Sequence, residues 1–257
     1  MTLKKRIMQD GLTRRNKMQV LKIVAEGLTT SFRYPHFMHG IHPTFEMPPP
    51  ATIYGHICSA LGHWVEPEGI EFAYHFTYQA AFNDLEHIHL VEASTGKIKG
   101  TSFEKVMEGQ INPFKRAQLF KPRLILYINK PEWKEMFLHP KYTVVLGRSQ
   151  DLFTYSKISV IELSKANRAY FEYTLVPYDK VLQVGQGYAV LMPKYLDYKN
   201  NRFPVFERYL ILKRRVFSDD FIRFENLHIE SDTEYLIDME SPEINGARLG
   251  LFFHKFI

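Results

Sequence analysis

Apolar and polar residues alternate along this chain with two periods, and the order of these patterns predicts the architecture. Residues 18–26 (MQVLKIVAE) are almost continuously apolar and β-rich, which is typical of a buried central strand that ends at Gly27. After a loop over residues 28–47, the apolar residues between 53 and 64 recur at helical spacing behind the prolines at 48–50. The predicted fold therefore starts with a strand and a proline-led helix.

Further strands and a short helix follow. Residues 71–81 (EFAYHFTYQAA) have the two-residue period of a strand. Residues 123–129 predict another strand, residues 131–138 a short helix, and residues 142–146 (YTVVL) a strand that Gly147 stops. The resulting order, β-α-β-β-α-β, is that of the ferredoxin-like (RRM-like) arrangement, which RNA-recognition modules use and unrelated functions share.

One face of the segment at 71–81 is aromatic, and it allows two interpretations. Its side chains are Phe72, Tyr74, Phe76 and Tyr78. Such rings could stack on RNA bases. A sheet must also bury one face under its helices, so we favour core packing for these rings.

An insertion and a β-rich remainder complete the predicted organisation. Residues 83–118 lie between the second and third strands and are too numerous for a hairpin loop, so we expect them to project from the sheet as a thumb. Beyond residue 152, short apolar runs predict further strands. We therefore predict an α+β protein with a basic arm (1–17), a ferredoxin-like domain (18–152) and a β-rich C-terminal region (153–257).

The net charge of +5 does not by itself indicate a nucleic-acid partner. The chain has 33 Lys and Arg against 28 Asp and Glu. Residues 1–17 hold six of the basic residues and one acidic residue, so 27 of each sign remain and balance. Any RNA-binding surface must be local, and residues 1–17 are either an RNA-contacting arm or a leader, disordered or mis-annotated, before a true start at Met18.

Composition also narrows the compartment and the chemistry. Cys58 is the single cysteine and cannot form an intramolecular disulfide, and no apolar stretch is long enough to span a bilayer. We expect a cytoplasmic protein. The loop histidines His36, His39 and His42 have no cysteine beside them, so we predict neither a metal site nor a cofactor.

A cluster of cations marks the end of the insertion. Residues 112–118 (NPFKRAQ), with Lys121 and Arg123 behind them, place four cations around two aromatic rings. This cluster is either a phosphate-binding surface or a solvated charged turn. Lys115, Arg116 and Gln118 are the candidate contacts.

Three motifs, in this order and spacing, resemble CRISPR-associated protein family five of the RAMP superfamily. They are SFRYP at 31–35, PPPATIYG at 48–55 and LGRSQDL at 146–152. The resemblance covers about residues 18–152 and is nearest to the type I-B branch. It implies a subunit of a type I CRISPR surveillance complex, Cascade, that binds the 5′ handle of the CRISPR RNA.

The resemblance also implies partners. These are the crRNA 5′ handle, the Cascade large subunit, and a backbone subunit that the thumb at 83–118 would contact. Target DNA near the protospacer-adjacent motif is a further candidate, and no membrane is expected.

The same motifs suggest how RNA is held. A proline-led helix start presents backbone N–H groups, so Ala51 and Thr52 could cradle a phosphate, helped by the Thr52 hydroxyl. Arg33 and Arg148 could clamp phosphates while Tyr34 offers a stacking plane. The complete set of predicted RNA-binding residues is Arg33, Tyr34, His36, Ala51, Thr52, Tyr54, Gly55, His56, Lys115, Arg116, Gln118, Arg148, Ser149 and Gln150.

We expect binding without catalysis. One branch of the family, type I-C, matures its RNA with a Tyr, Lys and His set, and the corresponding positions here are Phe45 and the pair Lys115-Arg116. Phenylalanine has no hydroxyl and arginine stays protonated, so neither can move a proton. Two alternatives stay open: a metal-independent endoribonuclease built from His36, His56 or Tyr54, and a scaffold that binds only proteins.

Overall fold

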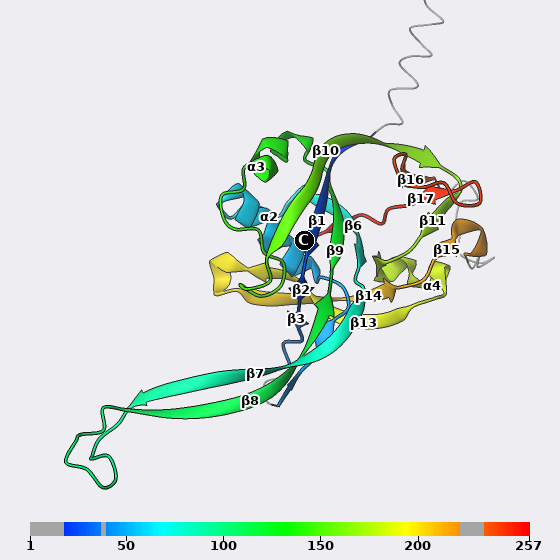
Figure 1. Cartoon of the computed structure of the whole chain (residues 1–257). Helices are drawn as coiled ribbons and strands as arrows, with labels where there is room; N and C mark the ends of the chain where they lie inside the picture. The colour runs from blue at the N-terminus through cyan, green and yellow to red at the C-terminus, as the bar shows by residue number, and fades with distance from the viewer. Residues whose placement is uncertain (1–17, 37–39, 222–233) are drawn as a thin grey trace, which may run out of the picture.

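The computed structural model describes residues 18–36, 40–221 and 234–257, and the predicted basic arm at 1–17 lies outside the described residues (Figure 1). At its centre is a six-stranded sheet with the strand order β16-β10-β1-β9-β6-β18. Strands dominate the described chain, which confirms the β-rich fold. No helix in this part of the chain is long and apolar enough to cross a bilayer.

The central strand β1 (Met18–Gly27) occupies the predicted position and is buried from residue 20 to residue 25. It pairs antiparallel with β10 (Phe153–Ala166) on one side and with β9 (Arg123–Ile128) on the other. β6 (Glu71–Thr77) pairs antiparallel with β9. Because successive side chains point to opposite faces, burial of residues 20–25 means that both faces of β1 are covered, which explains its nearly continuous apolar run.

Helix α2 (Pro50–Leu61) begins after Pro49 and ends at Gly62, which adopts the left-handed conformation with φ 84°. Its buried residues Ile53, Tyr54 and Ile57 pack in one cluster with the aromatic face of β6. Phe72, Tyr74 and Phe76 of that face are at most 1% exposed, so the predicted core packing is confirmed for them and base stacking is excluded.

The strand predicted at residues 142–146 is wrong. This segment forms only an isolated bridge between Val145 and Leu152. The backbone of Lys141 donates to the Ala60 carbonyl at the end of α2, which holds the segment as a loop over the helix. The place beside β1 belongs to β10, whose residues 153–163 pair along the whole of β1. Length of pairing therefore outweighs the β-rich composition of the shorter segment.

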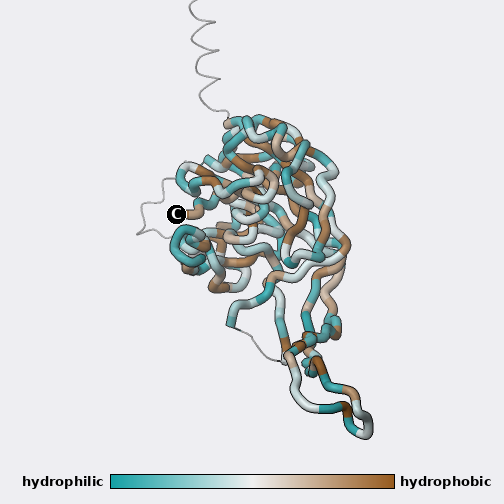
Figure 2. Tube along the Cα trace, turned by 90° about the vertical axis from the view of Figure 1, so that its left-hand side faces the viewer, coloured by the Kyte–Doolittle hydropathy of each residue, from teal (hydrophilic) through white to brown (hydrophobic). Residues whose placement is uncertain are grey.

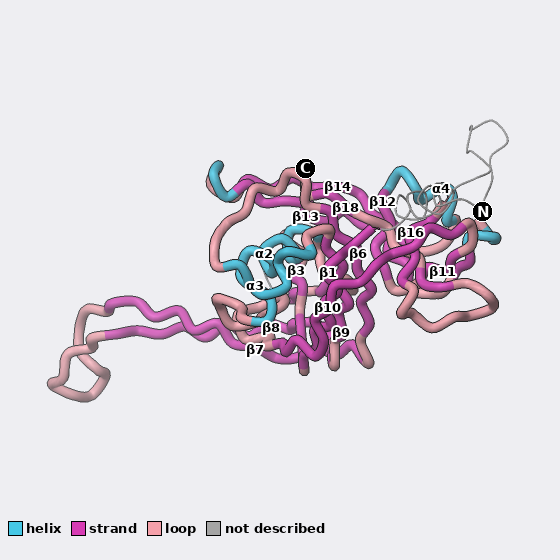
Figure 3. The backbone as a smooth tube through the Cα atoms, turned by 90° about the horizontal axis from the view of Figure 1, so that it is seen from above, coloured by secondary structure: helices cyan, strands magenta, loops and turns pink. Residues whose placement is uncertain are grey.

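The insertion is a long β-hairpin formed by β7 (Ala80–Ala93) and β8 (Met107–Phe120), which projects from the body of the molecule (Figures 1 and 3). Its strands pair without interruption from Ala80 opposite Phe120 to Ala93 opposite Met107. Hydrophobic residues continue along it outside the core (Figure 2). The predicted insertion at 83–118 lies within this hairpin.

Short strands join the hairpin to the body. β2 (Thr29–Thr30) pairs antiparallel with β8 near its end, and β4 (Ile41–His42) pairs with it in parallel. β3 (Phe32–Arg33) pairs with β5 (Thr44–Phe45). These contacts bring the loop before α2 against the base of the hairpin.

The remaining elements come from the second half of the chain. Strands β16 and β18 complete the central sheet, and the others form two three-stranded sheets, β15-β11-β17 and β12-β14-β13. The bounds of these strands are β11 (Ala169–Phe171), β12 (Thr174–Pro177), β13 (Tyr188–Asp197), β14 (Phe203–Leu212), β15 (Val216–Phe217), β16 (Tyr235–Asp238), β17 (Arg248–Leu249) and β18 (His254–Lys255). The short helices are η1 (Pro131–Trp133), α3 (Lys134–Leu138), η2 (Tyr178–Lys180), α4 (Val181–Val184), η3 (Tyr198–Asn200) and η4 (Ser218–Asp220).

Candidate nucleic-acid interface

A cavity of about 300 Å³ lies where the start of α2 meets β3, the base of the hairpin and the loop after residue 146. Four of the predicted RNA-binding residues line it: Arg33, Thr52, Arg116 and Arg148. We call it the α2 cavity.

The loop at 146–152 is fixed in place from both sides of Gly147. This glycine has φ +106°, and a Cβ there would lie 2.5 Å from Oγ1 of Thr30, so only glycine fits. The Thr30 hydroxyl donates to the carbonyl oxygen of Leu146 at 2.5 Å. The buried carboxylate of Asp151 accepts the backbone N–H groups of Ser31 and Arg148, at 3.2 and 2.9 Å. The loop is thereby tied to β2 and β3 and directs Arg148 toward the cavity.

The Arg148 guanidinium is already engaged by protein groups. It donates to Asp151 at 2.7 Å, to Glu86 on the hairpin, and to the amide oxygen of Gln118 at 3.2 Å. Burial opposes its charge, but the hydrogen bonds and the negative charges around it outweigh burial and raise the pKa of Arg148 above its ordinary value. Arg148 therefore stays charged and holds the loop against the hairpin.

Arg116 and Lys115 point to opposite faces of the hairpin because adjacent residues of a strand alternate. Arg116 is 8% exposed and pairs with Glu86 at 2.7 Å. Lys115 is exposed and has no acidic partner among the residues that the structure describes. The predicted pair therefore divides into a held cation inside the cavity and an exposed one outside it.

Arg33 is exposed at the rim of the α2 cavity, and no Asp or Glu of the described ranges forms an ion pair with it. The hydroxyl-bearing Thr52 lines the cavity too, but its backbone N–H donates to the Pro49 carbonyl at 2.8 Å. The expectation of an open backbone donor at Thr52 is therefore wrong, because the first turn of the helix closes onto Pro49. Ala51 is half-buried beside Thr52.

Tyr54 and His56 lie in the core and not at an RNA-accessible surface. They are 2% and 5% exposed and lie on different sides of α2, Tyr54 against the rings of Tyr195 and Phe256 and His56 against Tyr155. The Tyr54 hydroxyl donates to the Val65 carbonyl. Nδ1 of His56 lies 2.9 Å from the Val145 carbonyl, which can only accept, so Nδ1 carries the proton and Nε2 accepts from the Tyr155 hydroxyl at 3.0 Å. Burial lowers the pKa of His56.

The other predicted residues lie around the cavity without lining it. Ser149 and Gln150 are exposed in the loop that carries Arg148. Tyr34 is half-buried and stacks on Phe45, with 3.7 Å between ring centroids. Burial and the charge of Glu46 raise the pKa of Tyr34.

His36 and Gly55 have other neighbours. The ring of His36 stacks near Phe206 at 5.8 Å. Gly55 lines a separate cavity of about 200 Å³ with Cys58 and Trp64.

The acidic partners of this site escaped the sequence interpretation. Asp84 accepts from the amide of Gln118 at 2.9 Å, and Glu86 pairs with Arg116 and Arg148. Asp84 and Glu86 are two apart and face the same side of β7. That spacing, opposite the cations of β8, is a usable signal once the insertion is recognised as a hairpin.

Comparison with known proteins gives distant structural similarities. No family model matches the chain, and no curated protein matches it either. A chain of a "CRISPR RNA-guided surveillance complex" aligns with a TM-score of 0.40 and 15% identity. The alignment covers 52% of this chain and 59% of that neighbour. Two chains from cryo-EM structures of the type III-B Cmr-beta complex bound to cognate target RNA, one also with AMPPnP, have TM-scores of 0.42 and 0.43. Their identities are 13% and 12%, and each alignment covers 78% of this chain and 86% of the neighbour. These likenesses are too distant to assign a subunit role, a partner or an RNA to this protein.

Proposed function

We propose that this protein is a non-catalytic subunit of a type I CRISPR surveillance complex, of the type I-B branch, and that it binds the 5′ handle of the crRNA. The observation that carries the proposal is the composition of the α2 cavity. Each of the three motifs that resemble family five contributes to its lining: Arg33 from the first, Pro49 and Thr52 from the second, and Gly147 and Arg148 from the third. Motifs far apart in sequence therefore meet around one small, basic cavity.

The chemistry of this cavity suits a phosphodiester. Arg33 has its guanidinium donors available, and the Thr52 hydroxyl can donate to a phosphate oxygen. Arg116 and Arg148 add charge that Glu86 and Asp151 hold in fixed positions. Contacts of this kind position a strand without reading its bases, which is what an end-binding subunit needs.

The order of elements supports a ferredoxin-like domain. β1, α2, β6, β9, α3 and β10 follow one another in the β-α-β-β-α-β order, and their strands are arranged β10-β1-β9-β6 with antiparallel neighbours. β10 lies beyond the limit predicted at residue 152, so the proposed domain extends to residue 166. The remainder of the chain is the β-rich C-terminal region.

The hairpin is the proposed contact to a backbone subunit. On one of its faces lie the exposed apolar side chains Leu85, Val91, Met107 and Ile111, which are 56–63% exposed, together with the exposed polar residues His87, His89 and Lys115. The register of β7 and β8 puts these odd-numbered residues on the same side. An apolar strip on a projecting arm indicates a protein partner. The large subunit, and target DNA near the protospacer-adjacent motif, are the other proposed partners.

Binding without cleavage is the better-supported reading of the site. The two residues that an endoribonuclease would draw from α2, Tyr54 and His56, are buried and engaged in internal hydrogen bonds. General acid–base catalysis needs such groups within reach of the substrate. The absence of a cofactor or a metal from the function stays a prediction.

The test is a titration of the full chain with crRNA handle RNA at several salt concentrations. Arg33→Ala should weaken binding roughly tenfold and reduce the salt slope by about one, because a charge-assisted phosphate contact is lost. Arg214→Ala is the matched control, since Arg214 is also exposed and lies outside the α2 cavity.

Equal affinity of the wild type and Arg33→Ala would remove the α2 cavity from the RNA interface. An affinity for RNA that does not change with salt would instead favour the protein-only scaffold. Metal-independent cleavage of repeat RNA by the wild type would favour the endoribonuclease.

A further inference from the structure

A second cavity, of about 520 Å³, lies on the face of the central sheet that α2 does not cover. Strand alternation separates the two faces: Phe72, Tyr74 and Phe76 of β6 join the core cluster that includes α2, while His75 lines this cavity. Lys22 on β1 likewise lies between core residues and lines the cavity. We call it the open-face cavity.

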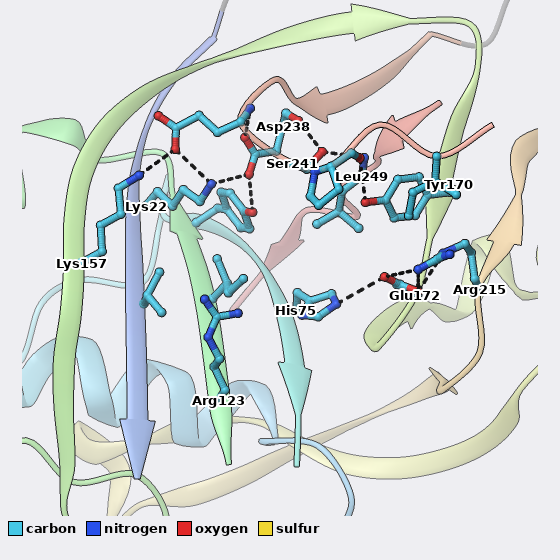
Figure 4. A pocket seen from close by; sticks show the side chains of 16 residues that line it. Lys22, His75, Arg123, Lys157, Tyr170, Glu172, Arg215, Asp238, Ser241 and Leu249 are labelled. Carbon is cyan, nitrogen blue, oxygen red and sulfur yellow. Dashed lines mark hydrogen bonds and ion pairs between the residues drawn. The ribbon is translucent and has the colours of Figure 1, made fainter. Parts of the chain in front are cut away.

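Ion pairs line this cavity on two opposite sides. Figure 4 shows Lys22 and Lys157 on one side, Glu172 and Arg215 on the other, and His75 between them. The side with Lys157 also carries the carboxylate of Glu240, and Arg215 accompanies Glu172 on the other side, which we call the carboxylate wall. Cations and carboxylates together suit a ligand that is both anionic and hydrogen-bond donating.

The inner end of the cavity is rigidly built. Nζ of Lys22 lies 2.6 Å from Oδ2 of Asp238 and 3.2 Å from Oε2 of Glu240. The Tyr127 hydroxyl donates to the same Asp238 oxygen at 2.7 Å. The side chains of Lys22 and Asp238 are 10% and 1% exposed, so this pair is shielded from solvent. Its groups are fixed before any ligand arrives.

The outer cations are held only by exposed ion pairs. Lys157 is 55% exposed and lies 3.1 Å from Glu240, which is 44% exposed. Arg123, which lines the cavity too, is 45% exposed and pairs with Glu26 at 2.9 Å. Exposed pairs of this kind contribute little to stability and exchange readily. A phosphate can therefore take over the donors of Lys157 and Arg123.

The opposite wall offers acceptors and an unsatisfied ring nitrogen. Burial opposes ionisation of Glu172, but hydrogen bonds and charge from His75 and Arg215 outweigh it and lower the pKa of Glu172, so it is an anionic acceptor. Nε2 of His75 lies 3.9 Å from Glu172, while Nδ1 is buried and has no hydrogen-bond partner among the described residues. Buried polar atoms are nearly always paired, so the unpaired Nδ1 of His75, a residue that lines the cavity, marks a place for a polar ligand.

We propose that the open-face cavity is a second ligand site, which binds a ribonucleoside phosphate. The phosphate contacts Lys157 and Arg123, and ribose hydroxyls or a base amino group contact Glu172 and His75. The carboxylate wall disfavours inorganic phosphate alone, and the volume suits a ligand of nucleotide size. The site does not depend on the handle-binding role of the α2 cavity.

The ligand could be a free nucleotide or one unit of an RNA strand, and the test distinguishes them. Calorimetry on the full chain would use adenosine 5′-monophosphate, its 2′-deoxy form, inorganic phosphate and the RNA trinucleotide AAA. We expect Lys157→Ala to lower affinity about tenfold, through loss of a charge-assisted contact. Glu172→Gln should reduce the preference for ribose over deoxyribose. Lys165→Ala is the matched control, because Lys165 is on the same strand, is 42% exposed and pairs with Glu234.

Binding of the monophosphate supports a free nucleotide, and binding of the trinucleotide alone supports a strand. The proposal is overturned if none of the nucleotides binds, if inorganic phosphate binds as well as they do, or if Lys157→Ala leaves affinity unchanged. Loss of trinucleotide binding in Arg33→Ala, with Lys157→Ala unaffected, would also overturn it while leaving the handle proposal intact.

Discussion

The two cavities use the same kinds of side chain but differ in what their cations are doing. In the α2 cavity, Arg116 and Arg148 are held by carboxylates while Arg33 has no acidic partner in the described part of the chain. In the open-face cavity, Lys22, Lys157 and Arg215 are all in ion pairs. One cavity presents a ready donor to an anion, and the other must exchange partners to bind one.

The cavities also differ in how the chain builds them. Tight turns and a helix start form the α2 cavity, so short motifs carry its residues. Register across β10, β1, β9 and β6 forms the open-face cavity, so its residues are single positions in separate strands. Local turns are readable from sequence, and a constellation that depends on register is not.

The largest expected effect lies in the inner end of the open-face cavity. Asp238→Ala would leave Lys22 as a buried, weakly compensated charge and remove the acceptor of the Tyr127 hydroxyl. We expect a loss of about 3–5 kcal/mol in the free energy of unfolding, measured by urea denaturation. Asp219→Ala is the control, because its pair with Arg168 is about half exposed on both sides and should cost less than about 1 kcal/mol. Equal stability of the two variants would contradict the rigid inner end.

A substitution in the α2 cavity should have a smaller effect on stability. Gly147→Ala would place a Cβ 2.5 Å from Oγ1 of Thr30 at a residue with φ +106°. We therefore expect a loss of about 2–3 kcal/mol in the free energy of unfolding. Binding of handle RNA should also weaken, because Arg148 would shift. Gly69→Ala is the control for backbone strain alone: it has φ +69° and nothing within 4 Å of the added atom. It should cost about 1 kcal/mol and leave RNA binding unchanged. Thermal unfolding and the same titration check both results.

Features with a local signal were predictable from the sequence, and features that depend on strand register were not. The apolar run at 18–26 and the proline-led helix have strong local signals and were predicted where they lie. Arg33 and Arg148 were predicted from their motifs, but Glu86, which pairs with Arg148, was not, because its position depends on the hairpin register. The strand at 142–146 was predicted from composition alone, and β10 takes its place because it pairs along all of β1. Nothing local connects His75, Lys157 and Glu172, so the open-face cavity has no sequence signature.

The smallest expected effect concerns the pH dependence of the carboxylate wall. The pKa of Glu172 is lowered from the ordinary 4.5 because His75 and Arg215 outweigh the effect of burial. A lowered folded-state pKa means that Glu172 stabilises the fold fully above pH 4.5, and that this contribution is lost as the pH falls through the folded-state value. Glu172→Gln should therefore reduce stability at neutral pH by about 1 kcal/mol or less, and the difference from wild type should disappear in acid. Unfolding followed from pH 7 to about pH 3 measures this. If the difference in unfolding free energy between Glu172→Gln and wild type stays constant over that range, Glu172 acts through packing and not through its charge. The contrast between the two cavities, one with a charged wall and the other with Arg33 unpaired in the described ranges, would then be lost.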